Sequence, residues 1–197
     1  AFFKGAQRRP VRSGPMLAIS LLVVAIMIGL GFQVGAGWEA YEFMFTYSGR
    51  ASLSRLMSYG DPGYMLLNWT VQQFGGDFWH VNLACGAIFA LGLYRLAKAQ
   101  DNPWLAVFVA VPYLIIVVSM GYARQAVAIG ILMMGLAGYG RNASVLRFAA
   151  YVLGAALFHK TAVVAMPLVA FGTRRNTLIN LLIAATTAYL LYDLFLS

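Results

Sequence analysis

Long apolar runs, separated by short polar or basic segments, are the feature that most constrains this chain. Such runs extend over residues 16–34, 78–96, 104–119 and 121–139. A helix needs roughly 20 mainly apolar residues to cross a bilayer, and it satisfies its backbone hydrogen bonds internally. With 61% hydrophobic and only 10% charged residues, a soluble globular domain is excluded. The sequence therefore predicts an all-α, polytopic transmembrane helical bundle.

The basic residues between these runs predict the orientation of the chain. Lysine and arginine collect in cytoplasmic loops, and a basic segment at residues 4–12 precedes the first run. We therefore place the N-terminus in the cytoplasm. The same residue types mark later cytoplasmic ends, at Arg95, Lys98, Arg141 and Arg147. The net charge of +8 is then a consequence of topology, and no nucleic-acid partner is expected.

Between the first two spans lie two segments that are too polar or too short to cross the bilayer. Residues 38–61 begin with several aromatic and acidic residues and are rich in serine, which is typical of an amphipathic helix at the interface. Asp61-Pro62 is a turn and helix-start signal, and the following apolar stretch Tyr64–Phe74 ends at a glycine pair. We predict a re-entrant or interfacial helix on the outer side.

The last third of the chain leaves two alternatives open. Its apolar stretch, residues 146–171, is interrupted by Phe158-His159-Lys160-Thr161. Either one span ends near Lys160 and an irregular segment returns to Arg174-Arg175, or one helix crosses with His159 inside it. A final span is predicted at about residues 178–195, which gives about six spans in one integral-membrane domain, residues 1–197. Because both ends are abrupt, we expect a fragment or a short version of a longer protein.

Arg124, at the head of the fourth apolar run, is the first candidate functional residue. An arginine costs roughly 2.5–3.5 kcal/mol at the bilayer centre on insertion scales, so it usually faces protein, a water-filled cavity or an anion. The alternative is an interfacial arginine whose side chain reaches the headgroups.

The predicted topology gathers further polar side chains near the same outer face. Arginine, lysine and histidine together suit an anionic headgroup, and the diphosphate of a lipid-linked donor is such an anion. A carboxylate or an imidazole beside it would deprotonate an attacking hydroxyl. Taken singly, Tyr41, Tyr64 and Lys160 are better explained as membrane-interface residues, whereas Arg124 and His159 together favour a functional role. The complete set is Glu39, Tyr41, Asp61, Tyr64, Tyr122, Arg124, Gln125, His159 and Lys160.

Motifs for metal or nucleotide chemistry are missing from the sequence. The chain has one cysteine and two histidines, and it contains no P-loop, HExxH or GxSxG motif. We therefore predict neither a metal site nor a cofactor.

Four short motifs, in this order, resemble the EpsG family of bacterial inner-membrane proteins. They are Val34-Gly35-x-x-Trp38-x-x-Tyr41, Asp61-Pro62-Gly63-Tyr64, Tyr122-Ala123-Arg124-Gln125-x-x-Ala128 and Phe158-His159-Lys160-Thr161-Ala162. The resemblance implies a role in exopolysaccharide and capsule assembly similar to that of Wzy-type polymerases, on a fold related to membrane glycosyltransferases of the GT-C class.

If the resemblance holds, the chain joins undecaprenyl-diphosphate-linked oligosaccharide repeats at the periplasmic face. Glu39, Asp61 and His159 are then the catalytic candidates, and Arg124 and Lys160 would hold the diphosphate. The remaining substrate-binding candidates are Gln125, Tyr41, Tyr64 and Tyr122.

Two departures from the family pattern keep a second hypothesis open. Family members often have an arginine just before the Val-Gly pair and an acidic residue just after it, where this chain has Gln33 and, nearest, Glu39. The alternative is a non-catalytic transmembrane subunit that packs against lipid and other membrane subunits in a larger complex. A transporter is disfavoured, because the sequence shows no duplicated half and no acidic mid-membrane coupling site.

Overall fold

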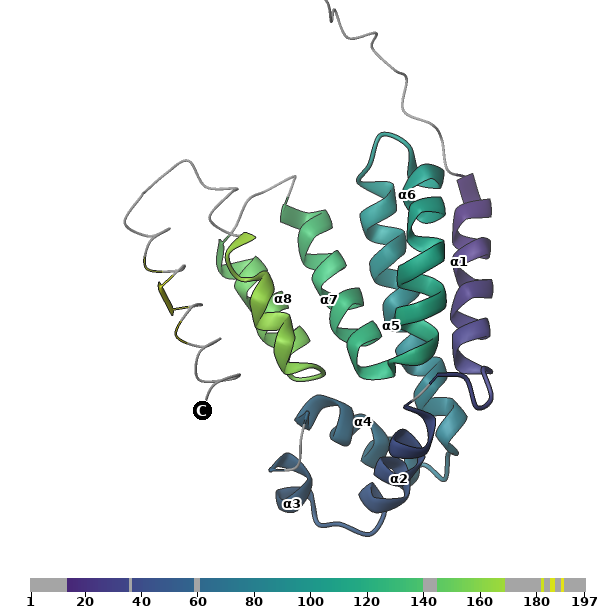
Figure 1. Cartoon of the computed structure of the whole chain (residues 1–197), viewed down its shortest axis with the longest axis vertical. Coiled ribbons are helices and arrows are strands. Elements are labelled where there is room, and N and C mark those ends of the chain that lie inside the picture. Colours follow the sequence, from purple (N-terminus) through teal and green to yellow (C-terminus); the bar gives the residue numbers. More distant parts are fainter. Residues whose placement is uncertain are drawn as a thin grey trace, which may run out of the picture.

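A computed structural model describes residues 14–35, 37–58, 61–139 and 145–168, together with Leu182, Ala185, Thr186 and Tyr189. Within these residues every regular element is a helix. A row of long helices makes up one part of the fold, and a lobe of shorter helices lies against one end of the row (Figure 1). The predicted all-α class is therefore confirmed for the described part of the chain.

The row contains α1 (Gly14–Gly29), α5 (Phe78–Lys98), α6 (Pro103–Ala110) with the π-helix η1 (Val111–Ser119), α7 (Ala123–Tyr139) and α8 (Val145–Ala156). The lobe contains α2 (Trp38–Ser48), α3 (Leu53–Met57) and α4 (Pro62–Gln73). A short 3-10 helix, η2 (Lys160–Ala165), follows α8.

Helix α5 is the centre of the row, because it packs against α1 and α7. A Cβ atom placed on Gly92 of α5 would lie 2.1 Å from the carbonyl oxygen of Gly130 in α7, so only glycine permits this approach. The two helices run in the same direction, since Cys85 clusters with Val127 and Arg95 contacts Met134. The start of α7 therefore lies at the same end as the start of α5.

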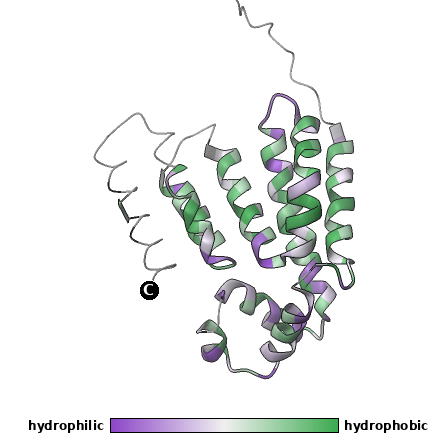
Figure 2. Cartoon of the chain, in the orientation of Figure 1, coloured by the Kyte–Doolittle hydropathy of each residue, from purple (hydrophilic) through white to green (hydrophobic). Residues whose placement is uncertain are grey.

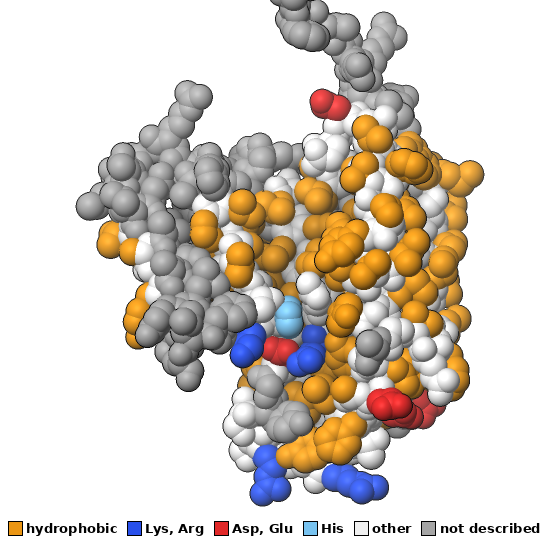
Figure 3. Space-filling view, in the orientation of Figure 1, with side chains coloured by type: hydrophobic (Ala, Val, Ile, Leu, Met, Phe, Trp, Pro, Cys, Tyr) orange, Lys and Arg blue, Asp and Glu red, His pale blue; other side chains and the backbone are white. Residues whose placement is uncertain are grey.

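The described residues contain one helix that is long and apolar enough to cross a membrane by length and composition, α5. Its 21 residues make a helix roughly 31 Å long at 1.5 Å per residue. Four shorter apolar helices accompany it, at Gly14–Gly29, Pro103–Ser119, Ala123–Gly138 and Leu146–Ala156. Large apolar side chains cover much of the row's surface (Figures 2 and 3); Phe108, for example, is 74% exposed. The expected number of about six spans stays a prediction.

Two helices differ from the predicted boundaries for local reasons. Helix α1 ends at Gly29 rather than near Val34, because the glycine-rich stretch that follows leaves the helix. The predicted third span is divided into α6 and η1. Pro112 lies at the beginning of η1, and because proline has no N–H it cannot continue the regular pattern of hydrogen bonds.

The structure decides between the two alternatives for the segment around His159. Helix α8 ends at Ala156, and His159 adopts an extended backbone conformation immediately before η2. His159 therefore lies in an irregular turn and not inside a crossing helix. The basic pair Arg174-Arg175 and the predicted span at 178–195, apart from four separate positions, lie outside the described residues.

Candidate functional site

Three polar side chains meet where the lobe touches the row of helices. Asp61 precedes α4, Arg124 lies in the first turn of α7, and His159 precedes η2. Arg124 Nη1 donates a hydrogen bond to Asp61 Oδ2 at 2.8 Å, and His159 Nδ1 lies 3.9 Å from the same oxygen. Figure 3 shows an acidic side chain and a histidine between basic side chains at this junction, below the apolar surface. We call these three residues the junction cluster.

The second carboxylate oxygen of Asp61 is also engaged. Asp61 Oδ1 accepts a hydrogen bond from the backbone N–H of Lys160 at 3.3 Å. Burial raises the pKa of this carboxyl, but the nearby imidazole of His159, the charge of Arg124 and the Lys160 N–H outweigh burial, so the pKa lies below its ordinary value. A carboxylate held ionised in this way is a weak base. Asp61 is thus better suited to position Arg124 and His159 than to accept a proton.

Two tyrosines complete the wall around Arg124. The guanidinium lies over the ring of Tyr41, 5.5 Å from its centroid, and Tyr41 packs edge to face against the fully buried Tyr64. Arg124 Nε, His159 Nδ1 and the Tyr64 hydroxyl are buried, and none has a hydrogen-bond partner among the described residues. Because buried polar atoms are normally paired, these atoms are available to a bound polar group.

The Asp61-Pro62-Gly63 motif explains how two distant segments are joined. Pro62 occupies the first turn of α4, where its missing N–H costs nothing. The Gly63 N–H donates to the carbonyl of Leu157 at 2.7 Å, and a Cβ on Gly63 would lie 2.9 Å from that oxygen. Glycine therefore lets the start of α4 bond directly to the turn that carries His159.

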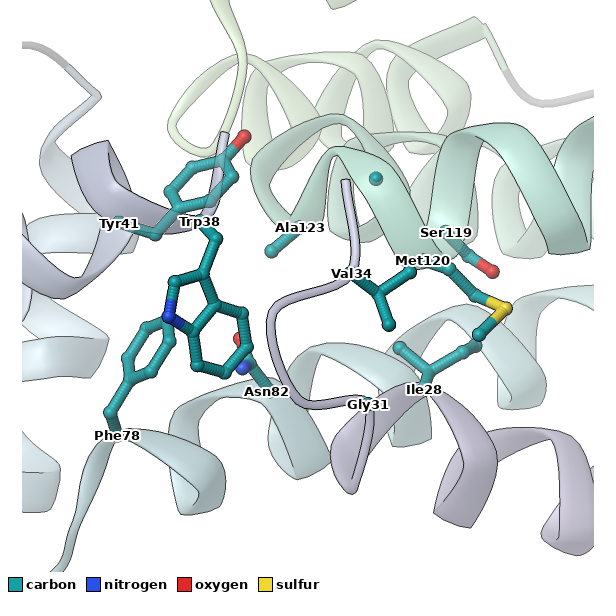
Figure 4. Close-up of a pocket in the computed structure, with 11 residues that line it drawn as sticks. Ile28, Gly31, Val34, Trp38, Tyr41, Phe78, Asn82, Ser119, Met120 and Ala123 are labelled. Carbon is teal, nitrogen blue, oxygen red and sulfur yellow. The ribbon is translucent and has the colours of Figure 1, made fainter. Parts of the chain in front are cut away.

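The Val34-Gly35 motif has a similar packing role. Gly35 has a φ of +87°, and a Cβ there would lie 2.5 Å from the Cα of Gly121. This contact holds the loop against the segment before α7 and places Trp38 and Tyr41 near Ala123 (Figure 4). The cavity among these residues is only about 20 Å³, which is room for about one water molecule. It is too small for a glycan.

A larger groove lies between α7 and η2, and His159 is the member of the junction cluster that lines it. Its volume is about 370 Å³, and its polar lining residues are Gln125, His159 and Thr161. Apolar residues line the rest, including Ile129, Leu132, Ala165 and Leu168. On α7 the lining runs from Gln125 to Leu132, which is roughly 10 Å along the helix axis. The groove is thus polar beside the junction cluster and apolar away from it.

The structure brings together some predicted site residues and separates others. Lys160 contributes its backbone N–H to Asp61, while its side chain is exposed. Tyr122 is 44% exposed, and Glu39 is exposed in the first turn of α2. Neither Tyr122 nor Glu39 forms a hydrogen bond or ion pair with the junction cluster within the described part of the chain.

Sequence reasoning did not identify Gly63 or Thr161 as site residues. Both belong to the motifs that contain Asp61 and His159, and this closeness in sequence is the signal that could have identified them. The other histidine, His80, has a local structural role, because its Nδ1 accepts a hydrogen bond from the Asp77 N–H at 2.9 Å at the start of α5. Among the described residues, no three histidine, cysteine or acidic side chains are placed to hold a metal ion.

Comparison with known proteins extends the motif resemblance to nearly the whole chain. The model of the EpsG family matches residues 16–197, a range that includes all four motifs and every residue of the junction cluster. Comparisons with curated proteins and with solved structures found no match. The chain therefore belongs to the EpsG family and is an exopolysaccharide-related membrane protein.

Proposed function

We propose that this chain is a polymerase of exopolysaccharide repeat units, a membrane glycosyltransferase acting on undecaprenyl-diphosphate-linked oligosaccharides. The reaction would take place at the periplasmic face of the bacterial inner membrane. The observation that carries the proposal is the junction cluster at the polar end of an apolar groove. Such a site combines charged groups for a diphosphate with an apolar surface for the lipid attached to it.

Arg124 is the proposed ligand of the donor diphosphate. Its Nη1 is held by Asp61, while its Nε is buried without a partner in the described residues and so has a hydrogen bond left to donate. A guanidinium that is already oriented stabilises the charge that develops on a leaving diphosphate without reorganising. Lys160, whose side chain is exposed beside the cluster, is the second cationic candidate.

His159 is the proposed general base. In the reaction, the acceptor hydroxyl oxygen forms a bond to the anomeric carbon of the donor, and the bond from that carbon to the diphosphate oxygen breaks. The lipid diphosphate leaves with the bonding electrons, and the imidazole takes the hydroxyl proton. Asp61 Oδ2, 3.9 Å from His159 Nδ1, would stabilise the imidazolium. Glu39 remains the alternative base only if α2 moves toward the cluster.

The groove between α7 and η2 is the proposed path of the polyprenyl chain. His159 and Gln125 line its polar end, and Leu132 and Leu168 line its apolar end. An amphipathic substrate would therefore place its diphosphate at Arg124 and its first isoprene units along α7. Gln125, at the boundary, would donate hydrogen bonds to the diphosphate or to the first sugar.

The experiment that tests the proposal is the length distribution of surface polysaccharide in cells that carry Arg124→Ala. We expect the ladder to collapse to single repeats while the protein level in the membrane is unchanged. Arg55→Ala is the matched control, because Arg55 is an exposed arginine of α3 outside the cluster, and its ladder should be normal. A normal ladder in both variants would contradict the polymerase proposal.

The second candidate function is a non-catalytic subunit of a membrane complex. It is favoured by one observation: in the described residues, Asp61 is the only acidic residue in the junction cluster, and its carboxylate is fully engaged. In that case the Arg124→Ala ladder would be normal, and a membrane protein would co-purify with the chain at constant stoichiometry in mild detergent.

A further inference from the structure

A second group of basic side chains lies at the opposite end of the row from the junction cluster. Arg95 and Lys98 lie in the last turn of α5, and Arg147 lies near the start of α8. They line one cavity of about 390 Å³, and Met134, Ala137 and Gly138 of α7 line it as well. Because α5 and α7 run in the same direction, this cavity is about one helix length from Arg124. We call it the basic pocket.

The two basic residues of α5 contact an aromatic ring and a sulfur atom. Lys98 Nζ lies 5.2 Å from the centroid of the Tyr94 ring, and Arg95 Nη1 makes a long contact of 3.7 Å with Met134 Sδ. Within the described residues neither side chain forms an ion pair, and the lining of the pocket contains no acidic residue. Asp101, the acid nearest in sequence, lines a different groove. The α5 side of the pocket is thus positively charged.

The arrangement goes beyond what topology alone requires. Basic residues that only mark a cytoplasmic end are scattered around the helix ends and extend toward the headgroups. Here two helices that are far apart in the sequence direct basic side chains toward one cavity with an apolar wall and two tyrosines, Tyr94 and Tyr151. Cations above an apolar wall, between helices at a membrane surface, are the chemistry that binds a phosphate headgroup.

We propose that the basic pocket binds the phosphate of an anionic phospholipid from the leaflet that surrounds this end of the bundle. Arg95 and Lys98 bind the phosphate oxygens, and the aromatic and apolar wall contacts the glycerol and the upper acyl chains. This site is separate from the junction cluster, and its occupancy does not depend on the polymerase activity. The same side chains also suit a soluble phosphate compound, so the experiment distinguishes the two sources.

The test compares lipid binding by the purified full chain in mild detergent, measured by native mass spectrometry with phosphatidylglycerol and with phosphatidylcholine. We expect a preference for phosphatidylglycerol that Arg95→Gln/Lys98→Gln reduces by about fivefold for each basic side chain removed. Arg50→Gln/Arg55→Gln is the matched control, because it removes two exposed arginines from the opposite lobe, and it should leave the preference unchanged. A monodisperse elution profile and a normal helix content establish that both variants are folded.

Three results would overturn or reassign the site. Equal binding of the two lipids by the unmodified chain, or an unchanged preference in Arg95→Gln/Lys98→Gln, overturns the proposal. If millimolar inorganic phosphate removes the preference completely, the phosphate site is supported and its ligand is a soluble phosphate. The variant Arg95→Lys/Lys98→Arg keeps both positive charges. It should keep most of the preference for phosphatidylglycerol that the unmodified chain shows, because the attraction to the headgroup depends mainly on charge.

Discussion

Among single residues, Asp61 makes the contacts that span the longest sequence separations in the junction cluster. It pairs with Arg124, 63 residues away, and accepts the N–H of Lys160, 99 residues away. Asp61→Asn keeps the shape but leaves the partly buried Arg124 without its counter-charge. We expect a loss of about 1–3 kcal/mol in the free energy of unfolding. Thermal unfolding in mild detergent measures it, and Asp101→Asn, in an exposed loop, is the control. Equal melting temperatures for the two variants would contradict the structural role of Asp61.

The lowered pKa of Asp61 makes this stabilisation depend on pH in one direction. Because the folded pKa lies below the ordinary value of 3.8, the carboxylate stabilises the fold above about pH 3.8 and this contribution is lost as pH falls through the folded pKa. The difference in melting temperature between the unmodified chain and Asp61→Asn should therefore shrink as the pH falls below about 4. A difference that grows as the pH falls below 4 would contradict this prediction.

At the scale of the element, the position of α4 depends on Gly63. Gly63→Ala places a methyl group 2.9 Å from the Leu157 carbonyl and separates α4 from the turn that carries His159. We expect shortened polysaccharide with the protein still folded, because the contact joins two segments and not the core of the row. Gly154→Ala in α8 is the control, since its Cβ would meet only Ile131 at 3.8 Å, and it should be neutral or stabilising by up to about 1 kcal/mol. A normal ladder for Gly63→Ala would show that the contact between Gly63 and Leu157 is not needed for polysaccharide elongation.

Individual elements also show how far the sequence could predict the fold and the site. Asp61-Pro62 predicted the start of α4, and the apolar run from Phe78 predicted α5, because both signals are local. The sequence predicted that Asp61 and Arg124 lie near the same outer face, but not that they form an ion pair. The backbone contact of Gly63 depends on tertiary packing, which the spacing of residues in the sequence does not encode. Glu39 was grouped with the cluster by topology, but its place in the first turn of α2 leaves it exposed.

For the whole molecule, the proposed function and the basic pocket require opposite ends of α5 to face opposite sides of the membrane. The lobe with α3 should be periplasmic, and the loop between α5 and α6 should be cytoplasmic with the N-terminus. Cys85 is the only cysteine and is buried, so Cys85→Ala gives a background for single-cysteine labelling. Ser54, in α3 of the lobe, and Asp101, in the loop between α5 and α6, are exposed. A cysteine at each position therefore labels one end of the row of helices.

In that background, Ser54→Cys should react with a membrane-impermeant maleimide in cells whose outer membrane is permeabilised. Asp101→Cys should react only after the inner membrane is opened, because a roughly 31 Å helix separates the two positions. The reverse pattern would place Arg124 and His159 in the cytoplasm, where periplasmic polymerisation cannot occur. Labelling of both positions in closed cells would mean that α5 does not cross the inner membrane, and it would remove the basis for an inner-leaflet lipid in the basic pocket.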